Sequence, residues 1–206
     1  MVATIGYDAF GRRQTKVTAT ARQYLYDGLN PVQELTGATP PGVTANLLTG
    51  LRIDEYFTRT DSTGIVSTLL RDALGSTVGL VGQSNTIATS YAYQPFGATT
   101  VSGAANGNVY QFTGRENDGS PGGLYYYRAR YYNPTYQRFV AQDPIDFRGG
   151  LNLYSYVGNS PLNFSDWWGL CGGQPEPQAQ PSLSPRPRIH PPVRCGHGLT
   201  PFVIRL

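Results

Sequence analysis

The stretch that decides the fold runs from residue 123 to residue 170 and reads GLYYYRARYYNPTYQRFVAQDPIDFRGGLNLYSYVGNSPLNFSDWWGL. Aromatic and β-branched residues alternate in it with turn signals at Asn133-Pro134, Asp143-Pro144, Gly149-Gly150 and Asn159-Ser160-Pro161. Short apolar runs bounded by turn residues are typical of strands. The stretch therefore predicts a series of short antiparallel strands.

The tyrosine-rich segment 125–132 is interpreted as one extended strand. Successive side chains of a strand point to opposite faces, so one face is expected to carry Tyr126, Arg128, Arg130 and Tyr132. An arginine beside tyrosines can stack on their rings and pair with a carboxylate through its planar fork. We therefore expect an acidic partner for these arginines, and the candidates are Asp143 and Asp166.

The composition of the whole chain favours turn-rich β structure. Its 206 residues include 25 Gly, 16 Pro and 15 Tyr, and only 14% are charged, which does not suit a helical protein or an ordinary enzyme. No run approaches the roughly 20 apolar residues of a membrane helix, and the N-terminus lacks the apolar core of a signal peptide. We expect no transmembrane segment. The chain could leave the cell by a dedicated machine, or be the C-terminal piece of a longer protein.

Four related segments precede the tyrosine-rich stretch, at intervals of about 20 residues with one longer gap, and such a period is typical of repeated strand-turn-strand units that stack on one another. They are 6–12, 26–30, 71–75 and 93–97. Glycine allows a positive φ at a turn, and aspartate can accept bonds from its own backbone there. We therefore interpret Asp8, Asp27 and Asp72 as structural rather than catalytic residues.

A boundary is predicted at Asn106-Gly107, which is a hairpin signal before the apolar segment 109–113. The chain then divides into repeats at 1–107, a core unit at 108–170 and a proline-rich tail at 171–206.

The core unit resembles the C-terminal core of the RHS (rearrangement hotspot, YD-repeat) family of bacterial proteins, and the upstream segments look like degenerate YD repeats. The matching residues are Gly123 to Tyr132, Arg138-Phe139, Gln142 to Ile145, Gly150 to Tyr154, Tyr156-Val157, Asn159, Pro161, Asp166 and Gly169-Leu170. The resemblance implies an all-β fold that forms the terminal part of a wrapped shell. It also implies a fragment of a polymorphic toxin or delivery protein that encloses a C-terminal toxin segment and releases it.

By motif, the resemblance places a self-cleavage site on Arg130, Asp143 and Asp166, with the cut between Leu170 and Cys171. Two carboxylates that share one proton can activate a water and donate to the carbonyl oxygen of the scissile bond. Asp166 precedes that bond closely, so a tight turn could present the bond to its own carboxylate. One turnover would be enough.

Two observations leave the enzymatic reading open. Trp167 stands where the family has proline, and the loss of a fixed φ is expected to loosen the turn. Asp143 and Asp166 are also ordinary turn residues, and Arg130 could be part of a structural ion pair. The alternatives are a non-enzymatic shell whose tyrosines bind cell-surface glycans or a partner, and an inactive truncated remnant.

The tail 171–206 is predicted to be disordered, because it is rich in proline and poor in apolar residues. Without disulfide bonds or a bound metal it is too short to build a toxin core. Its scattered arginines give no clear nucleic-acid binding site. It contains both cysteines, Cys171 and Cys195, and both histidines, His190 and His197, but their spacing matches no standard zinc pattern. We therefore expect no metal and no cofactor.

The family resemblance also implies partners and a location. The expected partners are a larger RHS shell or a neighbouring chain, and an immunity protein. The expected location is outside the cell or on its surface, reached through a dedicated secretion system.

Overall fold

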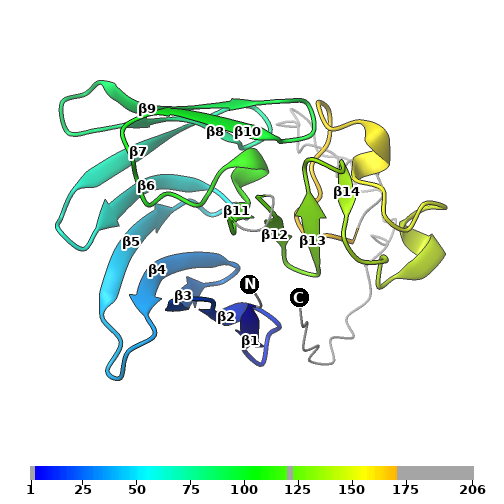
Figure 1. Cartoon of the computed structure of the whole chain (residues 1–206), viewed down its shortest axis with the longest axis horizontal. Coiled ribbons are helices and arrows are strands. Elements are labelled where there is room, and N and C mark those ends of the chain that lie inside the picture. The colour runs from blue at the N-terminus through cyan, green and yellow to red at the C-terminus, as the bar shows by residue number, and fades with distance from the viewer. Residues whose placement is uncertain (1–2, 120–122, 171–206) are drawn as a thin grey trace, which may run out of the picture.

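The computed structural model describes residues 3–119 and 123–170, which form two antiparallel β-sheets (Figure 1). The other regular elements among these residues are three short 3-10 turns, η1 (Phe112–Gly114), η2 (Asp146–Gly149) and η3 (Val157–Asn159). The predicted all-β antiparallel fold is confirmed. None of the described segments is a helix long and apolar enough to cross a membrane. The predictions made for the tail fall outside the described residues.

The first sheet contains ten strands in sequence order, each antiparallel to the next. They are β1 (Thr4–Tyr7), β2 (Arg13–Val17), β3 (Ala21–Asp27), β4 (Asn30–Thr36), β5 (Val43–Thr49), β6 (Tyr56–Asp61), β7 (Val66–Arg71), β8 (Thr77–Val81), β9 (Ile87–Tyr93) and β10 (Thr99–Gly103). Figure 1 shows the sheet curving from β1 round to β10, with the second sheet on its open side. The apolar side chains on one face of the strands, including Leu47, Tyr56, Leu69, Leu80 and Tyr91, form one core cluster.

Five turns of this sheet share one hydrogen-bond pattern. In each, the N–H of the first residue donates to the carbonyl four residues on, and the N–H of the fourth residue donates back to the first carbonyl. The first and fourth residues are Asp8 and Gly11, Asp61 and Gly64, Asp72 and Gly75, Gly82 and Asn85, and Gln94 and Gly97. The fourth residue has a positive φ in all five, which explains its bias toward glycine.

Asp8 and Asp72, which lie at two of these turns, have the structural role predicted for them. Asp8 Oδ1 accepts the N–H groups of Phe10 and Arg12 at 2.9 Å. Asp72 Oδ1 accepts those of Leu74 and Ser76 at 2.9 and 2.7 Å. The Asp61 turn lies in the longer gap between the second and third predicted copies and has the same bond pattern.

The second sheet contains β11 (Glu116–Asn117), β12 (Tyr125–Tyr127), β13 (Arg130–Asn133) and β14 (Arg138–Phe139). The prediction of a single strand over 125–132 is wrong, because the chain reverses at Arg128-Ala129 and Tyr127 pairs with Arg130. Arg128 adopts a φ of 57°, which is unusual for a residue with a side chain and gives no signal in the sequence. Arg128 and Arg130 therefore do not share a strand face.

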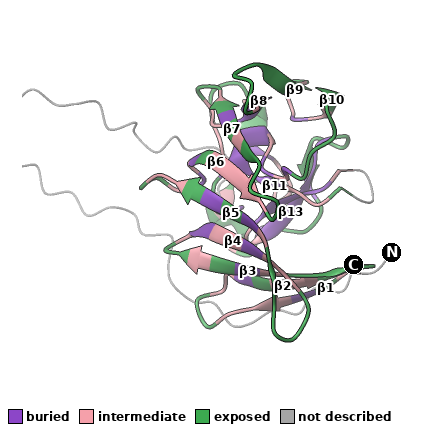
Figure 2. Ribbon diagram, turned by 90° about the vertical axis from the view of Figure 1, so that its left-hand side faces the viewer, coloured by how far each residue is buried: buried purple, intermediate pink, exposed green. Residues whose placement is uncertain are grey.

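The hairpin places its tyrosines on two faces. One face contributes to a cluster of buried aromatic rings that contains Phe112, Tyr125, Tyr127, Tyr132, Phe139 and Tyr156. The other packs Tyr126 and Tyr131 against Ile5 and Leu124. In Figure 2 the buried residues concentrate around β11 and β13, where the two sheets meet, whereas β9 and β10 are largely exposed.

The apolar segment 109–113, which follows the predicted hairpin turn, does not form a strand. Asn108 exchanges side-chain bonds with the backbone of Tyr110, which leaves a single bridge between Tyr110 and Glu116. The chain then turns through η1, where Thr113 has a φ of 50°. Tyr110 stacks on Tyr56 at a ring separation of 4.2 Å, so packing on the first sheet overrides the strand preference of this segment. The boundary at residue 107 stays a prediction.

Candidate active site

The three predicted site residues come from different elements and meet in the structure. Arg130 begins β13, Asp143 follows β14, and Asp166 begins the last described turn. Arg130 Nη2 lies 2.9 Å from Asp143 Oδ2 and 3.7 Å from Asp166 Oδ2. All three side chains are almost completely buried, at 3% exposure or less. The predicted pairing of Arg130 with an acidic partner is confirmed.

Arg130 is held in one orientation by bonds to the backbone. Its Nε donates to the Gly169 carbonyl at 2.5 Å, and its Nη1 donates to the Leu153 carbonyl at 2.9 Å. The guanidinium carbon also lies 3.6 Å from the centre of the Phe139 ring. A planar fork with donors in fixed directions suits this arrangement, which a lysine could not reproduce. Arg130 thus joins both carboxylates to the peptide just before Leu170.

Asp166 shapes the turn that carries the predicted cleavage position. Its Oδ1 accepts the backbone N–H groups of Trp168, Gly169 and Leu170 at 3.2, 2.8 and 3.2 Å. Its Oδ2 faces Arg130. Gly169 has a φ of 68° and its Cα passes close to the Tyr127 carbonyl, so a side chain would not fit there. The Asp166 side chain therefore bonds to three successive N–H groups of the turn that contains Trp167.

The carboxyl group of Asp143 has a raised pKa. Burial is the largest cause, and it outweighs the opposing effects of the Ile145 N–H and of Arg130. The Ile145 N–H donates to Asp143 Oδ1 at 3.0 Å. Desolvation of a carboxyl group favours its protonated form. This is the direction expected for the acid of a carboxylate pair.

Gly149 shows how close Asp143 comes to the Leu170 carbonyl. A Cβ on Gly149 would lie 2.5 Å from Asp143 Oδ2 and 3.2 Å from the Leu170 carbonyl oxygen. The two oxygens therefore flank the same small space, which is open because residue 149 has no side chain. Cys171, on the far side of the predicted bond, lies outside the described residues.

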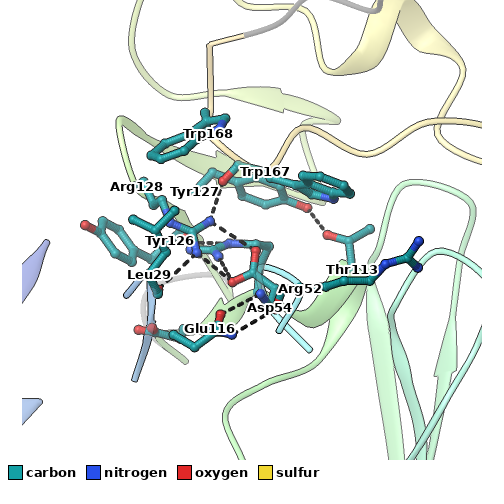
Figure 3. A network of polar contacts seen from close by, with 12 residues as sticks. Leu29, Arg52, Asp54, Thr113, Glu116, Tyr126, Tyr127, Arg128, Trp167 and Trp168 are labelled. Atoms are coloured by element: carbon teal, nitrogen blue, oxygen red, sulfur yellow. Dashed lines mark hydrogen bonds and ion pairs between the residues drawn. The ribbon is translucent and has the colours of Figure 1, made fainter. Parts of the chain in front are cut away.

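The structure also brings in Arg128 and Asp54, which the sequence reasoning did not assign to the site (Figure 3). Arg128 Nη1 donates to the Trp167 carbonyl at 2.5 Å, and Arg128 Nη2 lies 2.7 Å from Asp54 Oδ1. Asp54 lies in the β5–β6 turn with a φ of 61°. A lone Asp-Glu pair before an aromatic run gave no signal of this role.

Among the described residues, histidine, cysteine, aspartate and glutamate form no group of three that could hold a metal ion. The cysteines and histidines of the tail lie outside those residues.

Comparisons with known proteins connect the chain to toxins. No family model matches it. It is 30% identical over 182 residues to double-stranded DNA deaminase toxin A of Burkholderia cenocepacia (strain H111), an alignment that covers 80% of this chain and 13% of that protein. It is 40% identical over 86 residues to the toxin subunit YenC1 of Yersinia entomophaga, covering 39% of this chain and 9% of that protein. The chain thus spans about a tenth of the length of these toxins.

A crystal structure of TcdB2-TccC3 has the same fold, with a TM-score of 0.63 and 24% sequence identity. The match covers 81% of this chain and 9% of that one. Together these findings show an antiparallel β fold shared with a toxin complex and sequence similarity to toxin components.

Proposed function

We propose that this chain is the terminal part of an RHS toxin polypeptide, whose core cuts its own backbone after Leu170 and frees the segment that follows. The observation that carries the proposal is the meeting of two buried carboxylates, Asp143 and Asp166, at one nitrogen of Arg130. The similarity to toxin components supports the assignment to a toxin polypeptide.

The proposed reaction is an aspartic-type hydrolysis that consumes one water molecule. Asp166 takes a proton from the water as the water oxygen bonds to the Leu170 carbonyl carbon, while Asp143 donates a proton to the carbonyl oxygen. The C–N bond to Cys171 then breaks, the amine leaves with the proton from Asp166, and the diol returns a proton to Asp143. The products are a carboxyl group at Leu170 and an amino group at Cys171.

The division of roles is supported by the position and pKa of Asp143. Its carboxyl group faces the same space as the Leu170 carbonyl, and burial raises its pKa. Arg130 would stabilise negative charge on the pair throughout, as preorganised donors do in a buried site. Because substrate and site belong to one chain, the bond is presented at the high effective concentration of an intramolecular reaction.

The same proposal assigns the three parts of the chain. Residues 1–107 would be the last repeats of the shell, 108–170 the cleaving core and 171–206 the released tail. The relatives are many times longer than this chain, which fits a larger shell in the same or a neighbouring chain as partner. Export by a dedicated system and an immunity protein are the further expectations for such a toxin.

The glycan-binding alternative has less support in the described core. Its tyrosines are buried, including Tyr125, Tyr126, Tyr127, Tyr131 and Tyr132, while Tyr136 is 70% exposed. Sugar stacking requires exposed ring faces, so the tyrosine-rich segment serves the core rather than a carbohydrate ligand.

The test is the intact mass of the purified chain, measured beside Asp143→Asn and Asp166→Asn variants. We expect a wild-type product that ends at Leu170 and full-length variants. Asp72→Asn is the matched control, because it removes an exposed turn carboxylate and should leave cleavage unchanged. A wild-type chain that stays full length after prolonged incubation would overturn the proposal.

A further inference from the structure

Three consecutive residues of the β12–β13 hairpin turn donate to three consecutive carbonyls of the last described turn. The Arg128 side chain binds the Trp167 carbonyl at 2.5 Å, the Ala129 N–H binds the Trp168 carbonyl at 3.2 Å, and Arg130 Nε binds the Gly169 carbonyl at 2.5 Å. The next carbonyl in this register is that of Leu170. The three bonds therefore align the segment so that the following carbonyl reaches the space beside Asp143.

The bond from Arg128 to the Trp167 carbonyl depends on the ten-stranded first sheet. Arg128 forms a two-pronged ion pair with Asp54, through Nη2 to Oδ1 at 2.7 Å and Nη1 to Oδ2 at 3.0 Å. Its guanidinium carbon also lies 5.6 Å from the Trp168 ring (Figure 3). Such a fork is much more rigid than a single contact, so Asp54 fixes the nitrogen that holds Trp167.

Asp54 is itself firmly placed. Its side chain is 2% exposed, and Asn30 Oδ1 accepts its backbone N–H at 2.7 Å. Asn30 Nδ2 also donates to the Arg52 carbonyl at 2.8 Å, which ties the β3–β4 turn to the β5–β6 turn. A second cation, Arg115, reaches Asp54 Oδ1 at 2.5 Å. Two turns of the ten-stranded first sheet, called the repeat sheet below, thus support the position of Arg128.

We propose that Arg128 and Asp54 are positioning residues that hold residues 167 and 168, and thereby make cleavage after Leu170 depend on docking of the repeat sheet on the core. The proposal rests on the proposed function. Without the β5–β6 turn in place, Arg128 loses its carboxylate partner and the Trp167 carbonyl loses a fixed donor. The core would then cut only after the repeat sheet has folded onto it.

Trp167 and Trp168 give a readout that does not require cleavage, because they are the two tryptophans of the chain. Their fluorescence and its quenching by acrylamide are measured in an Asp143→Asn background, which is expected to remain uncut. Arg128→Gln is expected to shift the emission to the red and increase quenching, since the contact with the Trp168 ring and the bond to Trp167 are lost. Arg52→Gln is the matched control, because Arg52 lies exposed in the same turn as Asp54.

The second readout is the rate of cleavage in chains that retain Asp143. Arg128→Gln is expected to slow it at least about ten-fold, since a displacement on the order of 1 Å can cost about 100-fold in rate. Arg128→Lys keeps the charge opposite Asp54 but lacks the two-pronged fork, so it should give a smaller loss in rate and partial restoration of the tryptophan signal. Arg52→Gln should cleave at the wild-type rate.

The outcomes separate the two proposals. Wild-type quenching and cleavage in both Arg128 variants would overturn the positioning role, and if Arg128→Gln does not fold, the Arg128→Lys chain decides alone. A wild-type chain that never cuts would overturn the proposed function, and increased quenching in the Arg128 variants would then still support anchoring of residues 167 and 168.

Discussion

Gly149 keeps open the space shared by Asp143 Oδ2 and the Leu170 carbonyl oxygen. Gly149→Ala is expected to abolish self-cleavage while leaving the fold intact, because the new methyl group would push the carboxylate away from the bond. A change of this size near reacting atoms can cost about 100-fold in rate. The measurement is the fraction of cut chain by intact mass over time.

Gly42→Ala is the control for this prediction. A Cβ at Gly42 would meet Thr36 Oγ1 at 3.7 Å, which is an ordinary contact far from the site. Wild-type cleavage by the Gly149→Ala chain would show that Asp143 does not act on the Leu170 carbonyl from its observed position.

Asp54 makes the stability of the fold sensitive to acid. Burial alone would raise its pKa, but Arg115 and Arg128 outweigh burial and hold the pKa below its ordinary value of 3.8. The unfolded chain therefore binds a proton at this residue more readily than the folded chain. The resulting stability is fully present above about pH 4 and is lost as the pH falls through the lowered value.

Asp54→Asn is expected to lower the free energy of unfolding at pH 7 by about 3 to 5 kcal/mol, because it leaves buried Arg115 and partly buried Arg128 without a counter-charge. It should also lose less stability than the wild type between pH 5 and pH 2. Urea unfolding at several pH values measures both effects. If the free energy of unfolding fell equally with pH in the two proteins, the role of Asp54 in the acid sensitivity would be contradicted.

At the scale of elements, the repeated turn is the device that builds the first sheet. Asp72 Oδ1 accepts two backbone N–H groups across its turn. Asp72→Ala is expected to cost about 1 kcal/mol, the usual net value of such bonds, while Asp72→Asn keeps the acceptor oxygen and should cost little. Urea unfolding of the two variants provides the comparison, and equal losses would show that the carboxylate charge matters more than its bonds.

Sequence patterns predicted only some of these turns. Asp8 and Asp72 were predicted correctly, whereas the Asp61 turn was missed although it keeps the same aspartate and glycine as the Asp72 turn. It lies 11 residues before Asp72, off the interval of about 20 residues that links the other copies. The hairpin at Arg128-Ala129 was missed for a different reason. Arginine at a positive φ is not a turn signal, and its conformation is sustained by contacts with residues 54 and 167, which are distant in sequence.

The candidate site shows the same limit. The carboxylates Asp143 and Asp166 were found through resemblance to a family motif, and the prediction that one of them pairs with Arg130 was correct. The contributions of Gly149 and Asp54 depend on close approaches between separate loops. Spacing along the chain cannot reveal such approaches, because folding alone brings these loops together.

At the scale of the whole molecule, the curved sheet meets the core at its start, middle and end. At the start, fully buried Arg13 from β2 pairs with Glu116 and lies 2.6 Å from Asp118. In the middle, Asp54 pairs with Arg115. At the end, the Tyr132 hydroxyl donates to the Phe96 carbonyl at 2.8 Å. The four-stranded sheet and the loops around it are therefore bonded to the curved sheet at three separate places.

These ion pairs and this hydrogen bond predict that the two sheets unfold together, although the sequence places a boundary between them at residue 107. Separating the sheets would leave Arg13 and Asp54 buried without partners or force them into water, and each such loss costs several kcal/mol. A marginally stable protein cannot populate that intermediate. Tryptophan fluorescence, which reports residues 167 and 168, and amide exchange in β1 and β2 should therefore give the same unfolding transition in urea.

An Arg13→Met variant should separate the two transitions, since it removes the charge that ties the first hairpin to the core. The β1–β2 amides should then exchange at urea concentrations where the tryptophan signal is still native. Two separate transitions in the wild type would mean that the sheets are independent domains, and control of cleavage by docking would then have to act through an equilibrium between docked and undocked folded forms.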